Sequence, residues 1–411
     1  MRFVYTPVIP PFGGAGQNES VIAPLMDALS GRGGERIDAA GFGDPAPLVY
    51  VMATGGTERT LLQLQAVRQA ERPGEPVILV AHPGNNSLPA SLEVLARLQQ
   101  DELPGRIVFV RGPEDEAGLV TLDAAIADVA VRMRLLDTRI GLVGEPSDWL
   151  VASSPDADIV REVWGPTVIR VPMEELEAAI DAVAEDDVTV RVASLSGEAT
   201  GCAEPSEDDL ANVARVTAAM QGIVDTHEFD AVSLRCFDLL ASRETTGCFA
   251  LSELTDAGVM AGCEGDLVST VGMLWAYLMT GELPWMANPS ELDEAANTLK
   301  LAHCTIARGM LENYRLRSHF ESGQGVGIQG DLPLGPVTLL RIGGAAMNAL
   351  WLAEGEIVSR GDAENLCRTQ VDIELSNGDV SELLHAPLGN HIVLVRGHHG
   401  ARLEDWWETM L

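Results

Sequence analysis

The chain has 411 residues, a length that suits two or three domains of ordinary size. Hydrophobic residues make up 46% and charged residues 21%, which predicts packed cores and excludes wholesale disorder. Acidic residues outnumber basic ones by 61 to 27, and a net charge of −34 repels nucleic acids and anionic membranes.

The first part of the chain alternates strand-like and helical segments. Strands are predicted at residues 2–8, 48–54, 76–81 and 106–112, and helices at residues 60–70, from about 88, and at 119–136. Repeated β-α alternation is typical of a doubly wound parallel sheet. We therefore expect a Rossmann-like α/β domain at residues 1–137.

A second alternation follows at residues 138–283. It begins with TRIGLVGEPSDWLVAS, continues with a strand and a helix in TVIRVPMEELEAAIDAVAED, and TVRVASL predicts a further strand. Ser206, with acids directly after it, is a candidate helix N-cap, and Gly258 ends a predicted helix. We expect a second Rossmann-like α/β domain here, and it carries Glu264.

After residue 284 the pattern changes to short strand-like runs separated by Gly and Pro turns. Such runs are typical of an antiparallel, barrel-like β domain, which we expect at residues 284–411. The chain then ends in one predicted helix, ARLEDWWETML.

The sequence has neither a signal peptide pattern nor a run of about 18 apolar residues that would suit a membrane span. We expect a soluble, cytoplasmic protein whose acidity serves solubility or a salty cytoplasm. None of the six cysteines forms a CxxC pair, so buried free thiols are the simplest interpretation. They are Cys202, Cys236, Cys248, Cys263, Cys304 and Cys367.

Two loops that follow predicted strands in the first domain have two interpretations each. The loop GGTE at 55–58 lacks a phosphate-loop pattern, so it is either a tight turn or a ligand-facing loop. Asn85, Asn86 and Ser87 suit helix capping with an Asx turn, or the recognition of hydroxyls on a polyol.

The stretch GCEGDLVSTVGMLWAYLM places Glu264 and Asp266 before a strongly apolar helix. A carboxylate at this position gains from the helix dipole. Alternatively it binds a hard cation such as Mn²⁺ or Mg²⁺, which takes carboxylate oxygens and tolerates imidazole. Periodicity does not choose between these interpretations. His303, His319 and His391 lie in the β-rich part, where a lone histidine is more typically structural than a ligand.

Several ordered segments together resemble the L-fucose isomerase-like group of sugar isomerases, in particular its shorter members. The segments are GCEGDLVSTVGMLWAYLMTGELPWMANPSELDEAANTLKLAHCT, LRSHFESGQGVGIQGDLPLGPVTLLRIGG, ENLCRTQVDIE and GNHIVLVRGHHGARLEDWW, with GNNSLPASLE and GLVGEPSDWLV fitting the same group. The resemblance covers most of the chain and is strongest from Ala231 onward. It implies two α/β domains, a C-terminal barrel-like domain, and a homo-oligomer, a trimer or hexamer. The implied activity is aldose–ketose isomerisation with Mn²⁺ through an enediol.

The resemblance also implies roles for single residues. The family's first carboxylate, a metal ligand and acid/base group, falls on Glu264, and its histidine ligand falls on His391, with Asn390 beside it as a substrate-binding candidate. The family's second carboxylate falls on Asn288, which departs from the pattern. An amide can bind a cation through its oxygen but has no useful basicity near neutral pH.

The departure at Asn288 has several explanations. The metal site carries one negative charge less, or Asp266 or Asp293 supplies the missing acid. Alternatively, the alignment shifts at the turn, or the activity differs from that of fucose isomerase. Arg317, His319 and Glu321 in RSHFESG either bind sugar hydroxyls or a substrate anion, or form a structural turn network.

We therefore predict a metal-dependent aldose–ketose isomerase in which Glu264 moves the proton between C1 and C2. The expected substrate is a 6-deoxyhexose, a pentose, or an acidic hexose such as a sulfonated one. The alternatives are another enediolate enzyme, an epimerase or lyase, and a non-catalytic sugar-binding protein that has lost its base.

Overall fold

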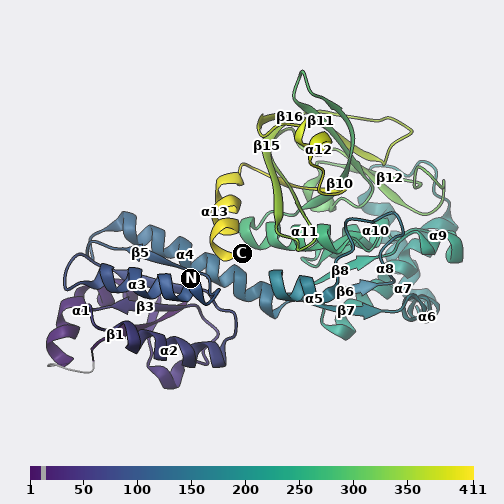
Figure 1. Ribbon diagram of the computed structural model, residues 1–411. Helices are drawn as coiled ribbons and strands as arrows, with labels where there is room; N and C mark the ends of the chain where they lie inside the picture. Colours follow the sequence, from purple (N-terminus) through teal and green to yellow (C-terminus); the bar gives the residue numbers. More distant parts are fainter. Residues whose placement is uncertain (11–14) are drawn as a thin grey trace. The chain divides into compact units, whose positions relative to one another are not determined.

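The computed structural model describes residues 1–10 and 15–411 (Figure 1). The chain divides into two structural units, residues 1–136 together with 405–411, and residues 137–404. The second unit contains both a parallel sheet and a β-barrel. The separate domains expected at residues 138–283 and 284–411 therefore share one unit, and the boundary between them stays a prediction.

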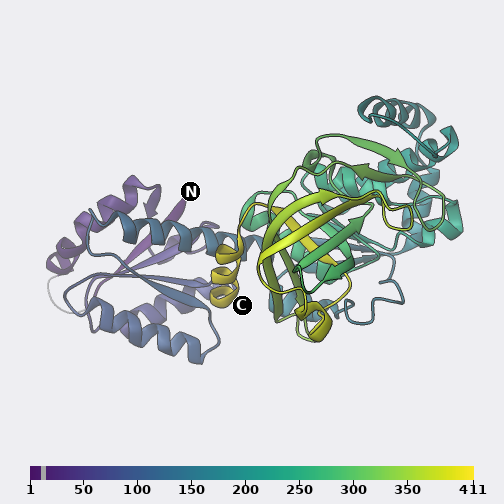
Figure 2. The ribbon, with the colours of Figure 1, turned by 90° about the horizontal axis from the view of Figure 1, so that it is seen from above.

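The first unit is built on a parallel sheet of order β2-β1-β3-β4-β5. Its strands are β1 (Phe3–Val8), β2 (Gly34–Arg36), β3 (Leu48–Met52), β4 (Val77–Ala81) and β5 (Gly105–Phe109). Its helices are α1 (Ala15–Gly31), α2 (Glu58–Glu71), α3 (Ser87–Gln100), α4 (Glu116–Asp137) and the short η1 (Ala39–Gly41), and they lie on both sides of the sheet (Figure 2). Because both faces are covered, every residue of β3 and β4 is buried.

The end of the last helix, α13 (Gly400–Met410), belongs to the first unit. Trp406 is fully buried there, and its Nε1 donates a hydrogen bond of 3.1 Å to the carbonyl oxygen of Asp128. Arg106 pairs with Asp405 at 3.2 Å. The predicted C-terminal helix is confirmed, but its final part packs with the first sheet.

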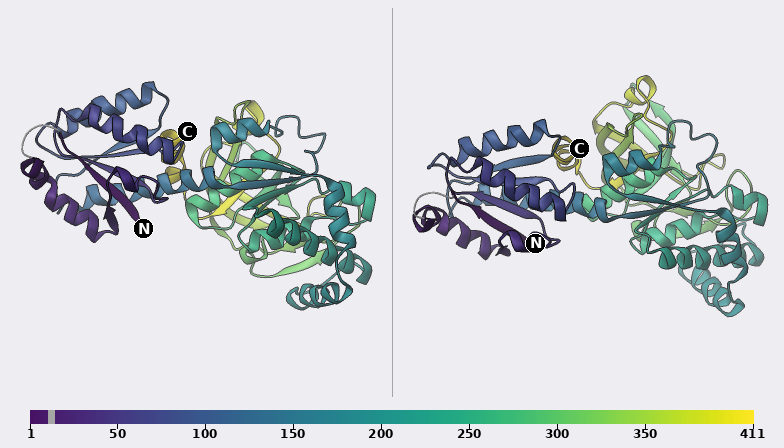
Figure 3. Two further views of the ribbon diagram at one scale, coloured as in Figure 1. Left: turned by 90° about the horizontal axis from the view of Figure 1, so that it is seen from below. Right: turned by 60° about the horizontal axis from the view of Figure 1, so that its bottom comes forward.

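The second unit begins with a parallel sheet of order β7-β6-β8-β9, seen from two further sides in Figure 3. Its strands are β6 (Arg139–Val143), β7 (Thr167–Val171), β8 (Ala231–Leu234) and β9 (Met260–Cys263). Its helices are α5 (Ala157–Ile159), η2 (Val160–Trp164), α6 (Met173–Asp181), α7 (Glu185–Glu198), α8 (Glu207–His227), α9 (Asp238–Arg243), α10 (Cys248–Asp256) and α11 (Leu267–Thr280). The predicted N-cap is confirmed, because Ser206 forms a capping box with Asp209.

The strand predicted from TVRVASL is wrong, because these residues lie in α7. Alternating valines imitate the period of a strand, yet Val190 is exposed while Val188 and Leu195, seven residues apart, are buried. That spacing places the two buried side chains on one helical face, which packs against α8. Three acids in the first turn also favour a helix through its dipole.

The rest of the second unit is a closed antiparallel barrel of order β10-β11-β16-β15-β14-β17. Its strands are β10 (Trp285–Asp293), β11 (Thr298–His303), β14 (Gly335–Gly343), β15 (Ala349–Arg360), β16 (Thr369–Asn377) and β17 (Ile392–Arg396). Beside it lie the hairpin strands β12 (Tyr314–Arg317) and β13 (Gly327–Gly330), with η3 (Arg308–Met310) and α12 (Glu382–His385). The predicted fold class, two parallel-sheet α/β parts followed by a β-barrel, is confirmed.

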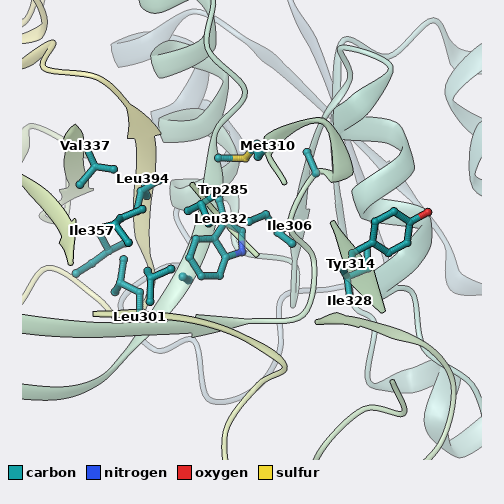
Figure 4. Packing of buried hydrophobic residues seen from close by; sticks show 14 of the residues in the cluster. Trp285, Leu301, Ile306, Met310, Tyr314, Ile328, Leu332, Val337, Ile357 and Leu394 are labelled. Carbon is teal, nitrogen blue, oxygen red and sulfur yellow. The ribbon is translucent and has the colours of Figure 1, made fainter. Parts of the chain in front are cut away.

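The barrel interior is filled by inward-facing side chains of its strands, among them Trp285, Leu301, Val337, Ile357 and Leu394 (Figure 4). Helix α11 links the barrel to the parallel sheet, because it contacts β8 and β9 as well as β14 and β17 (Figure 1). The strand β9, the helix α11 and the barrel therefore meet at the start of α11. None of the helices in the described residues combines the length and apolarity needed to cross a bilayer.

Candidate functional site

A cavity of about 490 Å³ lies in the second unit. It is bordered by the residues that follow the carboxyl ends of β8 and β9, the usual place for ligands in open α/β sheets, and by strands β10 and β11. Its apolar wall includes Trp149, Phe237, Leu240, Phe320 and Leu366. Its polar side chains include Glu264, Asn288, Ser290, His303, His319 and Glu321.

The backbone after β9 is shaped to present Glu264 to this cavity. Glu264 has a left-handed conformation with φ of 65°, which is uncommon for a residue with a side chain and is found at functional sites more often than elsewhere. Gly265 follows with φ of 74°, and a Cβ there would lie 2.7 Å from the Cα of Pro146. The carbonyl of Glu264 accepts a hydrogen bond of 2.8 Å from the Ser147 N–H, which fixes the turn.

Glu264, His303 and His391 form a buried group that could hold a metal ion. One ligand atom from each lies within 4.8 Å of the others. Nε2 of His391 is 3.8 Å from Oε1 of Glu264, and the two imidazole rings meet edge to face with centroids 5.5 Å apart. Carboxylate oxygen and imidazole nitrogen are a suitable donor set for a divalent transition-metal ion.

His391 is oriented by a buried charge network. Its Nδ1 donates a hydrogen bond of 2.9 Å to Oδ2 of Asp266, and that oxygen lies 3.3 Å from Nη1 of Arg341. Burial alone would raise the pKa of Asp266, but Arg341 and His391 together hold it well below its ordinary value. An ionised Asp266 fixes the proton on Nδ1 and leaves the Nε2 lone pair of His391 available.

The surroundings of Nε2 of His391 indicate whether these residues suit a cation. This atom is buried and has no hydrogen-bond partner within the described residues. Buried polar atoms normally have partners, so an orphaned imidazole nitrogen aimed at a carboxylate and a second histidine fits a bound cation. The donor set and its hydrogen-bonded support therefore suit a metal ion.

His303 lies on the barrel strand β11, and its Nδ1 shares a hydrogen bond of 2.9 Å with the Thr305 hydroxyl. Burial, together with the neighbouring His391 and His319, holds the pKa of His303 well below its usual value. The ring is therefore neutral near pH 7, which is the form that binds a metal.

Trp149 connects Glu264 to the apolar wall. Its Nε1 donates a hydrogen bond of 2.6 Å to Oε2 of Glu264. Its ring packs edge to face on Phe237 with centroids 5.0 Å apart, and Phe237 packs in the same way on His319 at 5.6 Å. Burial lowers the pKa of His319 to about 4, with a smaller contribution from Arg368, so this side chain is also neutral.

Most of the residues named from the sequence lie together. The cavity is lined by Glu264, Asn288, His319 and Glu321. His391, the residue directly before β17, lies beside Glu264. Asn288 is on β10, where its backbone pairs with Ala302, the neighbour of His303. Asn288 and His303 both line the cavity.

Other named residues lie elsewhere. Arg317 is not among the cavity-lining side chains and instead pairs with Glu204 at 2.6 Å and Glu364 at 2.9 Å. Asn390 is exposed outside the cavity lining. Neither of the proposed substitute acids provides a free carboxylate in the cavity.

Asp266 and Asp293 have structural contacts instead. Asp266 caps α11 by accepting a hydrogen bond of 2.8 Å from the Ser269 N–H, and it also binds His391 and Arg341. Asp293 is exposed and accepts from the Ala295 N–H over 2.8 Å at the end of its hairpin. The two acids that precede α11 thus have different contacts, since Asp266 caps the helix while Glu264 faces the cavity.

Sequence reasoning missed two residues of the site. The sequence pattern favours a structural role for His303 over a ligand role, so His303 is absent from the predicted ligand set, and the pattern does not single out Trp149 at all. Both lie inside segments quoted for the resemblance, LAHCT and GLVGEPSDWLV. Those segments were the available signal for them.

The cavity wall is also rich in sulfur. Five of the six cysteines line it: Cys236, Cys248, Cys263, Cys304 and Cys367. All six are free thiols, as expected, but Cys202 is exposed and Cys367 is half-buried.

The fold and the site define a class: an α/β protein with a β-barrel, in which a buried carboxylate and two histidines able to hold a cation adjoin a cavity of small-molecule size. No protein-family model matches the chain. The chain is 22% identical over 325 residues to the sulfoquinovose isomerase of Priestia megaterium, a match that covers 76% of this chain and 71% of the relative.

Two further relatives match shorter parts. The sulfoquinovose isomerase of a Clostridium species is 26% identical over 235 residues, or 56% of this chain and 51% of the relative. That of Alkalicoccus urumqiensis is 24% identical over 252 residues, or 57% and 54%. These homologues point to an aldose–ketose sugar isomerase of the fucose/arabinose isomerase-like kind. They do not establish membership of the L-fucose isomerase family itself.

Proposed function

We propose that the protein is a metal-assisted aldose–ketose isomerase whose open-chain sugar binds in the cavity beside Glu264. The observation that carries the proposal is the buried Nε2 of His391, which has no hydrogen-bond partner among the residues that the structure describes. Asp266 orients this histidine, which lies beside Glu264 and His303. The isomerase homologues support the same activity.

Glu264, His303 and His391 would hold the cation, and Mn²⁺ is the ion that the resemblance implies. A divalent cation bound there supplies Lewis-acid polarisation of the sugar carbonyl. Asn288 lines the same cavity and offers an amide oxygen to the cation or to a sugar hydroxyl.

Glu264 is the residue that moves the proton. Trp149 orients the carboxylate through Oε2, and the carboxylate would take the proton from C2 of an aldose and return it to C1 of the enediol. The carboxylate is nearly buried, and Phe237 and Phe320 are among the apolar side chains of the same cavity. His319, which lines the cavity and is neutral near pH 7, would bind a sugar hydroxyl.

For the substrate we propose a neutral sugar with an apolar end, a 6-deoxyhexose or a pentose. The lining contributed by the described residues contains no Lys or Arg, while Glu264 and Glu321 are acidic. A sulfonate group, as in the sugar named for the relatives, is best bound by a guanidinium or ammonium donor. The apolar wall of Trp149, Phe320 and Leu366 suits a methyl group or a bare ring face instead.

The remaining parts of the proposal come from the resemblance and the composition. We propose a cytoplasmic homo-oligomer, a trimer or hexamer, with Arg317 and Asn390 as outer residues of the substrate site. Arg317 is held by Glu204 and Glu364, so this role would require an exchange of partners.

The test is proton exchange followed by NMR in D₂O. Protein loaded with Mn²⁺ for preparation is incubated with fucose, arabinose, ribose and sulfoquinovose, and then the metal is removed before spectra are recorded. Deuterium at C1 or C2 together with aldose–ketose interconversion of a neutral sugar is the expected result. Interconversion of sulfoquinovose alone would overturn the substrate class, and C2 inversion or bond cleavage would indicate an epimerase or lyase. Tight sugar binding without exchange would indicate a binding protein.

A further inference from the structure

Two thiols lie side by side in the wall of the cavity. The Sγ atoms of Cys236 and Cys263 are 2.8 Å apart, and the residues are only 4% and 3% exposed. Both are free thiols that line the cavity, so a small molecule in the cavity reaches them.

The fold sets this pair. Strands β8 and β9 are hydrogen-bonded neighbours, and Leu234 is in register with Cys263 at their carboxyl ends. The N–H of Cys236 donates a hydrogen bond of 2.8 Å to the carbonyl of Leu234, a tight turn that keeps Cys236 at the strand end. The two sulfurs therefore meet because neighbouring parallel strands end together.

The distance between the two sulfurs is only slightly longer than a disulfide bond. A disulfide has an S–S length of about 2.05 Å, so bond formation requires the sulfurs to approach by about 0.8 Å. Side-chain rotation supplies a movement of that size, although a strained fit would be transmitted to the adjoining backbone.

That adjoining backbone belongs to the candidate site. Cys263 directly precedes Glu264, whose left-handed conformation and hydrogen bonds to Ser147 and Trp149 leave it little freedom. A disulfide at Cys263 would therefore change the backbone directly before Glu264, the residue whose carboxylate faces His391.

We propose that Cys236 and Cys263 are an oxidisable dithiol, a modification site for small hydroperoxides that enter the cavity, and that their disulfide displaces Glu264 and weakens cation binding. In the first step the sulfur of one thiol attacks a peroxide oxygen, the O–O bond breaks, and the leaving hydroxide takes the thiol proton, giving a sulfenic acid and, from hydrogen peroxide, water. The second thiol then attacks the sulfenic sulfur, and a second water leaves as the S–S bond forms. The sum is two thiols and one hydrogen peroxide giving one disulfide and two waters. A dithiol reductant reverses the modification.

The consequence for catalysis rests on the proposed function, but formation of the disulfide does not. The first measurement is therefore chemical. The cation-free protein is treated with hydrogen peroxide, blocked with iodoacetamide, digested without reductant and mapped by mass spectrometry. The expected result is a Cys236–Cys263 linkage that dithiothreitol removes.

The digestion must separate the competing cysteines. Trypsin cuts after Arg235 and Arg243 and releases Cys236 on a short peptide, but it leaves Cys248 and Cys263 together on the peptide that ends at Lys300. A second protease that cuts after Glu253 separates those two. No linkage, or a linkage only among Cys248, Cys304 and Cys367, would overturn the proposal.

The second measurement links the disulfide to the site. Calorimetric titration with Mn²⁺ is carried out before and after oxidation, and we expect oxidised protein to bind at least about 10-fold more weakly, the scale of losing an outer support. Cys236→Ser and Cys236→Ala should each show the same affinity before and after peroxide, whereas Cys202→Ser, at an exposed thiol, should respond as the unmodified protein does. A mapped linkage with unchanged Mn²⁺ affinity would refute the coupling to Glu264. If the reduced protein binds Mn²⁺ but exchanges no sugar proton, the proposed function fails while the dithiol proposal stands.

Discussion

Nε1 of Trp149 donates a 2.6 Å hydrogen bond to Oε2 of Glu264, while the other carboxylate oxygen, Oε1, lies 3.8 Å from Nε2 of His391. One oxygen is thus held by the wall of the cavity and the other faces the histidine group. The two halves of a single carboxylate have different environments, which makes the indole a positioning group for Glu264.

Replacing Trp149 with Phe keeps an aromatic ring against Phe237 but removes the donor. Hydrogen bonds to charged groups contribute about 1.5–3 kcal/mol, so we expect kcat to fall about 10- to 100-fold with a smaller change in KM. Steady-state kinetics on the sugar identified by NMR provide the measurement. Leu366→Ala is the matched control, because it alters the wall, and hence KM, while it leaves Trp149 and its ring partner Phe237 in place. Unchanged kcat in Trp149→Phe would refute the positioning role.

Glu264→Gln should fold, retain some metal binding through His303 and His391, and lose turnover by about 10²–10⁴-fold, the usual contribution of an acid/base group. Deuterium exchange at C2 measures this loss directly. Glu321→Gln changes another carboxylate that lines the same cavity and should retain exchange. Wild-type exchange in Glu264→Gln would show that a different group moves the proton.

His303→Asn should weaken Mn²⁺ binding by more than about 10- to 100-fold, the range found when only an outer support of a metal site is lost. Isothermal titration calorimetry or equilibrium dialysis gives the affinities. His385→Asn removes an exposed histidine from α12 and should bind Mn²⁺ as the unmodified protein does. Equal affinities in the two variants would remove His303 from the ligand set.

Asp266→Asn should destabilise the fold as well as the site. Arg341 is 2% exposed and would lose its buried carboxylate partner, a change that typically costs about 3–5 kcal/mol. Urea denaturation of the cation-free protein measures this free energy of unfolding. Asp293→Asn, at an exposed turn, should change it by no more than about 0.5 kcal/mol. A loss of metal affinity without loss of stability would mean that Arg341 finds another partner.

The stability of the second unit should depend on pH through His319. Its pKa is lowered from 6.5 to about 4, so between these values the unfolded chain binds a proton that the folded one does not. The contribution is fully present above pH 6.5, is lost progressively as the pH falls to about 4, and reaches at most about 3 kcal/mol. Urea denaturation at several pH values should therefore show a shallower acid-side decline in His319→Gln than in the unmodified chain. Equal slopes in the two proteins would contradict the assignment.

Local sequence patterns were sufficient for much of the fold. The apolar runs of β3 and β4 predicted buried strands. The acids after Ser206 predicted the N-cap there. Helix α7 is an exception, because its sequence predicted a strand. A short run of alternating valines satisfies both periods, and only its packing against α8 selects the helix.

The site was harder to predict from the sequence, because strand register brings its residues together and they are far apart along the chain. Glu264 and His391 came from motif resemblance. His303 lies near His391 because β10 pairs with both of their strands, Asn288 with Ala302 and Ala287 with Ile392, and no local pattern encodes those pairings. The thiol pair is a similar case, since the register of Leu234 with Cys263 brings Cys236 beside it.

The three residues proposed to hold a cation come from two different parts of the second unit. Glu264 follows a strand of the parallel sheet, whereas His303 and His391 belong to the barrel side. A cation bound here would link the parallel sheet to the barrel, and its binding free energy would add to the free energy of unfolding of the second unit. Transplanting the barrel alone into a relative would carry two of the three ligands and leave the third behind. Sheet and barrel therefore each supply part of the proposed cation site, and neither part would be complete without the other.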